Sequence, residues 1–221
     1  MTRVSAEDAA CRIREVGIIA IVRGDYSLSQ LRDIADVLEE GGVGVMEVTL
    51  NSTSALECIA ALRSFAGNRL LVGAGTVRTP EDVDRALEAG AQFLVSPNFD
   101  PESAFCAIDA GVLHLPGVFT ASEAQQALRA GCRMQKLFPA GQLGPSYLEA
   151  LRAPLGDIEF VPTGGIDAGN VAAFVRAGAV ALGIGSALVA GPRQDLSALR
   201  QRVEQLTSVL QAARLEYRMP V

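Results

Sequence analysis

Short runs of apolar and β-branched residues alternate along the chain with longer segments in which apolar residues recur every three or four positions. The first pattern is typical of buried strands and the second of amphipathic helices. In residues 27–40, for example, Leu31, Ile34 and Leu38 fall on one helical face. The pattern predicts eight strands, over residues 17–22, 45–50, 70–73, 92–96, 112–116, 133–138, 158–162 and 179–184.

The ends of the predicted helices repeat a short motif. EAGA, DAGV, RAGC and RAGA each lead into a strand, and their glycines are Gly90, Gly111, Gly131 and Gly178. Glycine there lets a helix end in a left-handed backbone. The spacing of about 20 residues fits repeated strand–helix units, and eight units predict an α/β fold, a (β/α)8 TIM barrel. An open doubly wound sheet is the alternative, but it does not require eight evenly spaced units.

A further helix is predicted before the first strand, over residues 5–16. Ser5 is its expected N-cap, with Asp8 three residues later. We expect this extra N-terminal helix to close the bottom of the barrel. The sequence has no composition shift that marks a linker, so residues 1–221 are expected to form one barrel domain.

Composition narrows the classes of function. The net charge is −6 and basic residues form no run, which argues against nucleic acid or an anionic membrane as a partner. The longest uncharged apolar stretch, residues 177–191, is shorter than the roughly 20 residues that span a bilayer. The N-terminus is too charged for a signal peptide. The four cysteines are widely spaced, which predicts neither a zinc site nor disulfides and favours a cytoplasmic protein.

Two residue types occur only once. Lys136 is the single lysine among 19 basic residues, and His114 is the single histidine. Lysine chemistry must therefore use Lys136 or the N-terminal amine, and a metal site built from several histidines is excluded. For His114, a histidine satisfied within a strand is favoured over a catalytic one.

In a (β/α)8 barrel the active site lies at the carboxyl ends of the strands. Lys136 lies near such an end. Arginine stays charged and cannot act as an amine nucleophile, so a lone lysine in a chain that otherwise uses arginine is a candidate for Schiff-base formation. A dry pocket would lower its pKa and supply the free amine. An ion-paired or snorkelling lysine is the alternative.

Glu47 lies inside the apolar strand predicted over residues 45–50. A carboxylate in such a strand is costly unless it is paired or has a chemical role. If Glu47 points into the barrel, it meets Lys136 as an ion-pair partner or as a general acid and base. The alternative is a structural ion pair with an arginine.

Two glycine-containing turns follow the last two predicted strands. One contains Thr163, Gly164 and Gly165, and the other contains Gly185 and Ser186. Backbone N–H groups in such turns can converge on a phosphate, supported by a helix N-terminus, and phosphate sites in these two loops recur in the fold. Ordinary strand–helix turns are the alternative.

These motifs resemble the bacterial 2-keto-3-deoxy-6-phosphogluconate (KDPG) aldolases and their relatives. Those relatives include the 2-keto-3-deoxy-6-phosphogalactonate (KDPGal) aldolases and 4-hydroxy-2-oxoglutarate aldolase. The resemblance extends from about residue 17 to residue 189. It is carried, in order, by GGVGVMEVTLNS, LLVGAGTV, FLVSPNFD, LPGVFTASEA, QKLFPAGQLGPSYLEAL, FVPTGGI and GIGSALV.

The resemblance implies a class I aldolase on a TIM barrel. Such an enzyme cleaves a 2-keto-3-deoxy-6-phospho sugar acid to pyruvate and glyceraldehyde 3-phosphate, as in the Entner–Doudoroff pathway. It also implies a homotrimer that needs no metal or other cofactor and takes only small-molecule substrates.

The motifs also assign roles to residues by resemblance. Lys136 matches the Schiff-base lysine, Glu47 the general acid and base, and Thr76 a ligand of the pyruvate carboxylate. The other residues implied to bind substrate are Arg23, Asn51, Pro97, Phe138 and Thr163, and those implied to hold the phosphate are Gly164, Gly165, Gly185 and Ser186.

One position departs from the pattern of the KDPG aldolases. An arginine commonly follows EVTL there and holds the carboxylate, whereas this chain has Asn51. The LNS and IVRG segments look more like KDPGal aldolases, but VPTGG resembles the KDPG branch. The sequence therefore leaves the substrate open among the members of the family.

Two rival functions remain open at this point. A phosphate-binding barrel isomerase or synthase would use Glu47 as a base and Lys136 only as a charge, without a covalent intermediate. A noncatalytic, trimeric ligand-binding protein would tolerate Lys136→Arg in all its functions.

Overall fold

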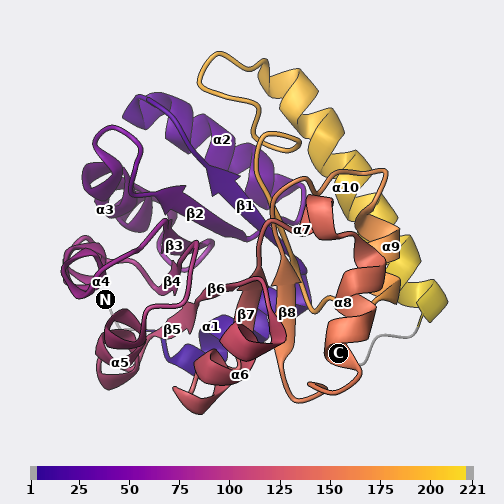
Figure 1. Ribbon diagram of the computed structural model, residues 1–221. Helices are drawn as coiled ribbons and strands as arrows, with labels where there is room; N and C mark the ends of the chain where they lie inside the picture. The colour runs from indigo at the N-terminus through magenta and orange to yellow at the C-terminus, as the bar shows by residue number, and fades with distance from the viewer. Residues whose placement is uncertain (1–3, 218–221) are drawn as a thin grey trace.

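The computed structural model describes residues 4–217, which form a barrel of parallel strands surrounded by helices (Figure 1). The strands are β1 (Ile18–Val22), β2 (Val45–Thr49), β3 (Leu71–Gly75), β4 (Phe93–Val95), β5 (Leu113–Leu115), β6 (Gly117–Val118), β7 (Met134–Leu137), β8 (Glu159–Pro162) and β9 (Leu182–Ile184). The helices are α1 (Ala6–Val16), α2 (Leu28–Glu40), α3 (Ala55–Ala66), α4 (Pro80–Glu88), α5 (Pro101–Asp109), α6 (Ala121–Arg129), α7 (Ala140–Leu143), α8 (Pro145–Arg152), α9 (Val171–Arg176) and α10 (Leu196–Tyr217). The predicted (β/α)8 TIM barrel is confirmed.

The barrel consists of two sheets joined at two places. One sheet has the order β5-β4-β3-β2-β1-β9 and the other β6-β7-β8. Only Pro116 separates β5 from β6, and its missing N–H interrupts the hydrogen-bond ladder there. On the other side, the Val180 N–H donates to the Phe160 carbonyl oxygen at 3.0 Å, and Thr163 bridges Gly183. All eight predicted strands are present, and the fifth extends beyond residue 116 as β6.

The first and last strands of the barrel pair with each other, with Ile18 opposite Leu182. Helix α10 is fastened nearby by Arg214, whose guanidinium donates to the carbonyl oxygen of Glu15 at 2.7 Å. The guanidinium also lies against Gly17, where an added Cβ would be 2.6 Å from Cζ of Arg214. The two ends of the described chain are therefore fixed to each other.

The interior of the barrel has an apolar layer and a polar layer. The apolar layer joins α1 to the inner faces of the strands through Ala9, Ala10, Ile13, Ile19, Val45, Leu71, Phe93, Leu115, Met134, Val161 and Ala181. Helix α1 thus closes one end of the barrel, as expected, and the Ser5 side chain caps it by accepting a hydrogen bond from the Asp8 N–H at 3.1 Å. The polar layer, at the carboxyl ends of the strands, contains the buried side chains of Glu47, Lys136 and Thr163.

The local signals for helix ends also behave as predicted. Pro80 and Pro101 begin α4 and α5, where proline costs no hydrogen bond. Gly90 and Gly111 follow those helices with φ angles of +92° and +69°, in the left-handed region that glycine tolerates. Across residues 4–217, no helix is long and apolar enough to cross a membrane.

Candidate active site

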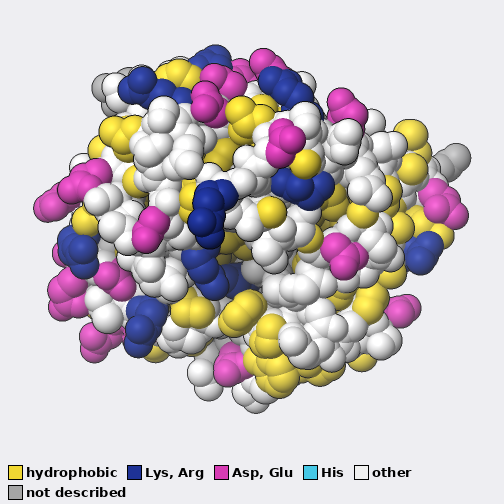
Figure 2. Space-filling model, turned by 90° about the horizontal axis from the view of Figure 1, so that it is seen from above, with side chains coloured by type: hydrophobic (Ala, Val, Ile, Leu, Met, Phe, Trp, Pro, Cys, Tyr) yellow, Lys and Arg dark blue, Asp and Glu magenta, His cyan; other side chains and the backbone are white. Residues whose placement is uncertain are grey.

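A cavity of about 460 Å³ opens at the carboxyl ends of β1, β7, β8 and β9. Seen from above, Lys and Arg side chains gather around a hollow near the middle of this face (Figure 2). Eight of the predicted site residues line the cavity: Arg23, Lys136, Phe138, Thr163, Gly164, Gly165, Gly185 and Ser186. The structure therefore brings the predicted lysine and both glycine-containing turns to one place.

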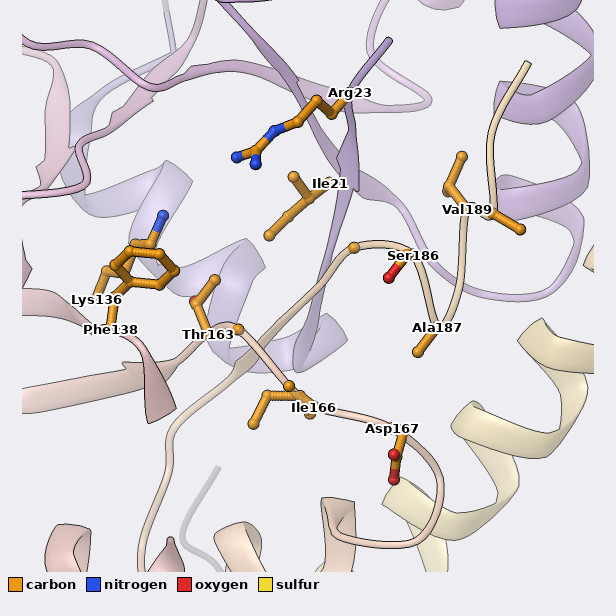
Figure 3. A pocket seen from close by; sticks show the side chains of 14 residues that line it. Ile21, Arg23, Lys136, Phe138, Thr163, Ile166, Asp167, Ser186, Ala187 and Val189 are labelled. Carbon is orange, nitrogen blue, oxygen red and sulfur yellow. The ribbon is translucent and has the colours of Figure 1, made fainter. Parts of the chain in front are cut away.

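Lys136 lies on β7, where it is paired with Gly117 and its backbone N–H donates to the Pro116 carbonyl oxygen at 2.9 Å. Its side chain is only 5% exposed, and Nζ lies 4.7 Å from the centre of the Phe138 ring. Figure 3 shows Nζ of Lys136 and the guanidinium of Arg23 pointing into the same space. Burial lowers the pKa of Lys136, the charge of Glu47 opposes that effect, and the charge of Arg23 adds to it. This environment favours a free amine.

Glu47 lies on β2 with its side chain inside the barrel, and it is 2% exposed. Burial raises its pKa from 4.5 to about 7, although the positive charges of Lys136 and Arg23 act in the opposite direction. A carboxyl group with a pKa near neutrality can both accept and donate a proton at physiological pH. The structural ion pair that the sequence left open is not seen, since none of the ion pairs among the described residues includes Glu47.

The turn after β8 brings the backbone close to two neighbours. Gly164 and Gly165 have φ angles of +85° and +75°. An added Cβ would lie 3.0 Å from the Phe138 ring at position 164 and 3.0 Å from the Cα atom of Gly141 at position 165. Both the backbone conformation and the available space thus require glycine. The close approach of Gly141 was not predicted, because the sequence alone does not show which loops touch.

The turn after β9 exposes backbone donors to the same cavity. The N–H groups of Leu188 and Val189 both donate to the Gly185 carbonyl oxygen at 2.9 Å. Within residues 4–217, the N–H groups of Gly165, Ser186 and Ala187 donate no hydrogen bond and are free to bind an anion. The next described helix, α10, begins only at residue 196, so no helix N-terminus lies directly behind this turn in the chain.

Four predicted site residues do not line this cavity. Glu47 lies deeper in the barrel, as described above, and Pro97 follows β4. Thr76 follows β3 with a φ of +60°, an uncommon backbone conformation for a residue other than glycine and one that recurs at functional sites. Asn51 is exposed in the loop after β2 and makes no hydrogen bond with another described residue.

The structure adds cavity residues that the sequence did not single out: Ile21, Ile166, Asp167, Ala187, Val189 and Ala190. Most are apolar residues next to the glycine turns, and apolar residues carry no distinguishing signal in a sequence that is 49% hydrophobic. The Asp167 carboxylate accepts a hydrogen bond from the Gly169 N–H at 2.8 Å, which holds the loop beyond the turn.

His114 is buried in β5, as the sequence favoured, but it is only partly satisfied, because its Nδ1 atom has no hydrogen-bond partner among the described residues. Its Nε2 atom forms a 2.7 Å hydrogen bond with the Ser96 hydroxyl, and the side chain is 3% exposed. Burial lowers its pKa to about 4, so the imidazole is neutral at physiological pH.

Comparison with known proteins agrees with this geometry. The family model described as KDPG and KHG aldolase matches residues 9–203. The chain belongs to this family. A 2-dehydro-3-deoxy-phosphogluconate aldolase from Treponema pallidum is 36% identical over 92% of this chain and 98% of its own length. A 2-dehydro-3-deoxy-6-phosphogalactonate aldolase from Escherichia coli K12 is 38% identical over 77% of this chain and 83% of its own length.

Solved structures of the family superpose closely on this barrel. A native KDPGal structure aligns with a TM-score of 0.86 and 33% identity, over 90% of this chain and 96% of that one. A KDPG aldolase from Legionella pneumophila, with pyruvate captured at low pH as a covalent carbinolamine intermediate, aligns with a TM-score of 0.77 and 27% identity. That alignment covers 93% of this chain and 97% of the other. Membership of the KDPG and KHG aldolase family makes the chain an aldolase, a carbon–carbon lyase.

Proposed function

We propose that this aldolase cleaves a 2-keto-3-deoxy-6-phospho sugar acid, KDPG or KDPGal, to pyruvate and glyceraldehyde 3-phosphate through a Schiff base on Lys136. One observation carries the proposal: the only lysine of the chain is buried in the cavity, close enough to the buried Glu47 for each charge to shift the pKa of the other. The covalent pyruvate adduct of the Legionella relative supports the same chemistry.

The bond changes follow from these two groups. The neutral amine of Lys136 adds to the C2 ketone, and the carbinolamine takes a proton from the Glu47 carboxyl group and loses water to give an iminium ion. Glu47, through a water molecule, accepts the proton of the C4 hydroxyl. The C3–C4 bond then breaks, its electrons enter the iminium to give an enamine, and the aldehyde leaves. Glu47 returns the proton to C3, and hydrolysis releases pyruvate and the free amine while the proton set free in this step goes back to Glu47. One carboxyl group serves both steps because its protonation state alternates.

Other predicted site residues, inside the cavity and beside it, bind the substrate in this proposal. Arg23 and Thr76 hold the carboxylate next to the reacting carbon, and Phe138, Pro97 and Thr163 line the sugar site. Asn51 is exposed in the loop after β2, and in this proposal it contacts the substrate through its side-chain amide. The absence of an arginine at position 51 leaves Arg23 as the cation available to the carboxylate.

The phosphate lies between the two glycine-containing turns in this proposal. The free N–H groups of Gly165 and Ser186 point to this role, and Gly164 and Gly185 shape the turns. Binding energy from the phosphate, remote from the bond that breaks, holds C2 of the substrate against Lys136.

The test is reduction with borohydride in the presence of pyruvate, followed by intact-mass analysis and peptide mapping. We expect one reduced adduct, located on Lys136, and none in Lys136→Arg, which keeps the charge but loses the nucleophile. A folded protein that forms no adduct would refute the Schiff base and favour an isomerase or synthase that uses Glu47 as a base.

Substrate choice is tested separately. Pyruvate release is followed with KDPG, KDPGal and 4-hydroxy-2-oxoglutarate, and we expect the two phosphorylated substrates to give the higher kcat/KM. A preference for 4-hydroxy-2-oxoglutarate, which carries no phosphate, would refute the proposed phosphate-binding role of the glycine-containing turns.

We also propose that the protein is a cytoplasmic homotrimer. A related structure is described as a cage made by fusing symmetric oligomeric domains, and α5 of this chain exposes 60% of Phe105 and 42% of Ile108. All four cysteines are free, which suits a reducing compartment. Light scattering coupled to size exclusion should give three times the 23.1 kDa mass of the chain.

A further inference from the structure

The inner face of β3 carries no side chain beside the catalytic layer. Gly73 and Gly75 both lie on this face, next to β2, where Glu47 pairs with Gly73 and Thr49 with Gly75. An added Cβ at Gly75 would lie 2.8 Å from Cδ of Glu47, and nearer still to its Oε1 atom. The same Cβ would lie 3.2 Å from Cγ2 of Thr49. The carboxyl group of Glu47 therefore occupies the space that a side chain at position 75 would fill.

The backbone does not require glycine at this position. Gly75 is not among the residues with a positive φ angle; it forms a regular strand whose carbonyl oxygen accepts the N–H of Leu50 at 2.8 Å. In this respect it differs from Gly164 and Gly165, whose left-handed conformations need glycine. What remains as the reason for a glycine at position 75 is space for the Glu47 carboxyl group.

We propose that Gly75 is a positioning residue for catalysis: by leaving its side of the barrel empty, it seats the Glu47 carboxyl group against β3, buried and facing Lys136. This inference rests on the proposed role of Glu47 as the proton carrier. The charged groups that face Glu47 are Lys136 from β7 and Arg23 from the end of β1.

An alanine at position 75 would fill the space that the Glu47 carboxyl group occupies, which we call the seat of Glu47. This substitution changes the conformation of the Glu47 side chain more than it changes the fold. The atoms that an alanine methyl group would strike first belong to the free end of the Glu47 side chain, which rotates at little cost. A rotated carboxyl group leaves its buried place, so its pKa falls and its distance to the reacting carbon changes. Proton transfer depends on both the pKa and the geometry of the base.

Gly73 provides a matched control on the same strand. A Cβ there would lie 2.5 Å from the Phe93 ring rather than against Glu47. Gly73→Ala therefore crowds the barrel interior at the fully buried Phe93 ring, and no atom of Glu47 is among the three that lie nearest to the added methyl group. Its effect should appear in stability and not in proton transfer.

The experiment measures exchange of the pyruvate methyl hydrogens with deuterium from solvent, by NMR, as a function of pH. This partial reaction needs only the Lys136 iminium and a base, so it does not depend on which aldehyde the enzyme uses. We expect Gly75→Ala to slow exchange by about 100-fold, at the lower end of what general acid–base catalysis contributes, and to move the Glu47 limb of the pH profile to lower pH. Gly73→Ala should keep the wild-type profile.

A rescue distinguishes seating from general damage. Aspartate is one methylene shorter than glutamate, so Glu47→Asp in the Gly75→Ala background relieves the contact. We expect each single variant to exchange more slowly than wild type. The double variant should exchange at least tenfold faster than the rate obtained by multiplying the two separate losses. Multiplicative losses, or a Gly75→Ala enzyme with wild-type exchange, would overturn the proposal.

Two further readouts separate the possible failures. Borohydride trapping should persist in Gly75→Ala, because Lys136 is untouched. If Gly75→Ala does not fold, the double variant Glu47→Ala/Gly75→Ala must recover folding, and its failure to do so overturns the seat. If the wild-type protein is neither trapped by borohydride nor active in exchange, the proposed function is wrong. If wild type behaves as expected and only the Gly75→Ala expectations fail, the positioning role of Gly75 alone is wrong.

Discussion

The buried carboxyl group of Glu47 should make the stability of the protein fall as pH rises. Its pKa in the folded chain is raised to about 7 from an ordinary value of 4.5, so the folded state holds this proton more tightly than the unfolded state does. The resulting stabilisation is complete below about pH 4.5 and is lost as pH rises to about 7. The difference between the two pKa values corresponds to about 3 kcal/mol.

The substitution Glu47→Gln isolates this contribution, because glutamine keeps the shape and does not titrate. We expect the free energies of unfolding of the two proteins to be similar near pH 4.5. By pH 8 the variant should be the more stable protein by about 3 kcal/mol, a gain in stability accompanied by a loss of catalysis. Urea unfolding at several pH values, followed by circular dichroism, gives the difference directly.

Two further proteins sharpen the experiment. Glu149→Gln makes the same change at an exposed carboxylate of α8 and is the matched control. Lys136→Met removes a positive charge that lowers the pKa of Glu47, so the gap between glutamate and glutamine should widen in that background. Parallel curves for wild type and Glu47→Gln from pH 4.5 to 8 would show that the Glu47 carboxyl group is not held in a buried, protonated state.

Three substitutions test glycines elsewhere in the barrel. Gly17→Ala combines a φ of +74° with displacement of the Arg214 guanidinium and should lower the free energy of unfolding by about 3 kcal/mol. Gly42→Ala, with a φ of +84° and open space around it, should lower the free energy of unfolding by only about 1 kcal/mol in the same denaturation assay. Equal losses in the two variants would show that the contact of Arg214 with Gly17 does not contribute to stability. Gly165→Ala forces a Cβ against Gly141 and should raise the KM for a phosphorylated substrate at least tenfold, while pyruvate exchange stays as in wild type; a loss of exchange instead would place this turn in the chemistry rather than in phosphate binding.

Much of the fold was predictable because its signals are local. Strand and helix periodicity, prolines at helix starts and glycines at helix ends act within one or two turns of chain, and they predicted all eight strands. Lys136 stood out because this chain otherwise uses arginine for its positive charges, and Glu47 because a carboxylate in an apolar strand is costly.

Features that depend on contacts between distant segments were not predictable. The space beside Gly75 is visible only once the register of β2 against β3 is known. Gln135 is a second example: a polar residue in a buried strand had no explanation in the sequence. In the structure, its amide nitrogen donates to the carbonyl oxygens of Ala124 and Cys132 at 3.0 and 2.8 Å, which fastens β7 both to α6 and to the segment that follows this helix.

Pairing between the first and last strands has a consequence for synthesis of the chain. Because Ile18 on β1 lies opposite Leu182 on β9, a ribosome must release almost the entire chain before the barrel can close. Until then β1 is an unpaired edge of the apolar sequence IIAIV, which is the kind of edge that recruits strands from other molecules. Truncated chains that end before residue 182 should therefore aggregate, and a nascent chain of this protein depends on protection until its last strand emerges.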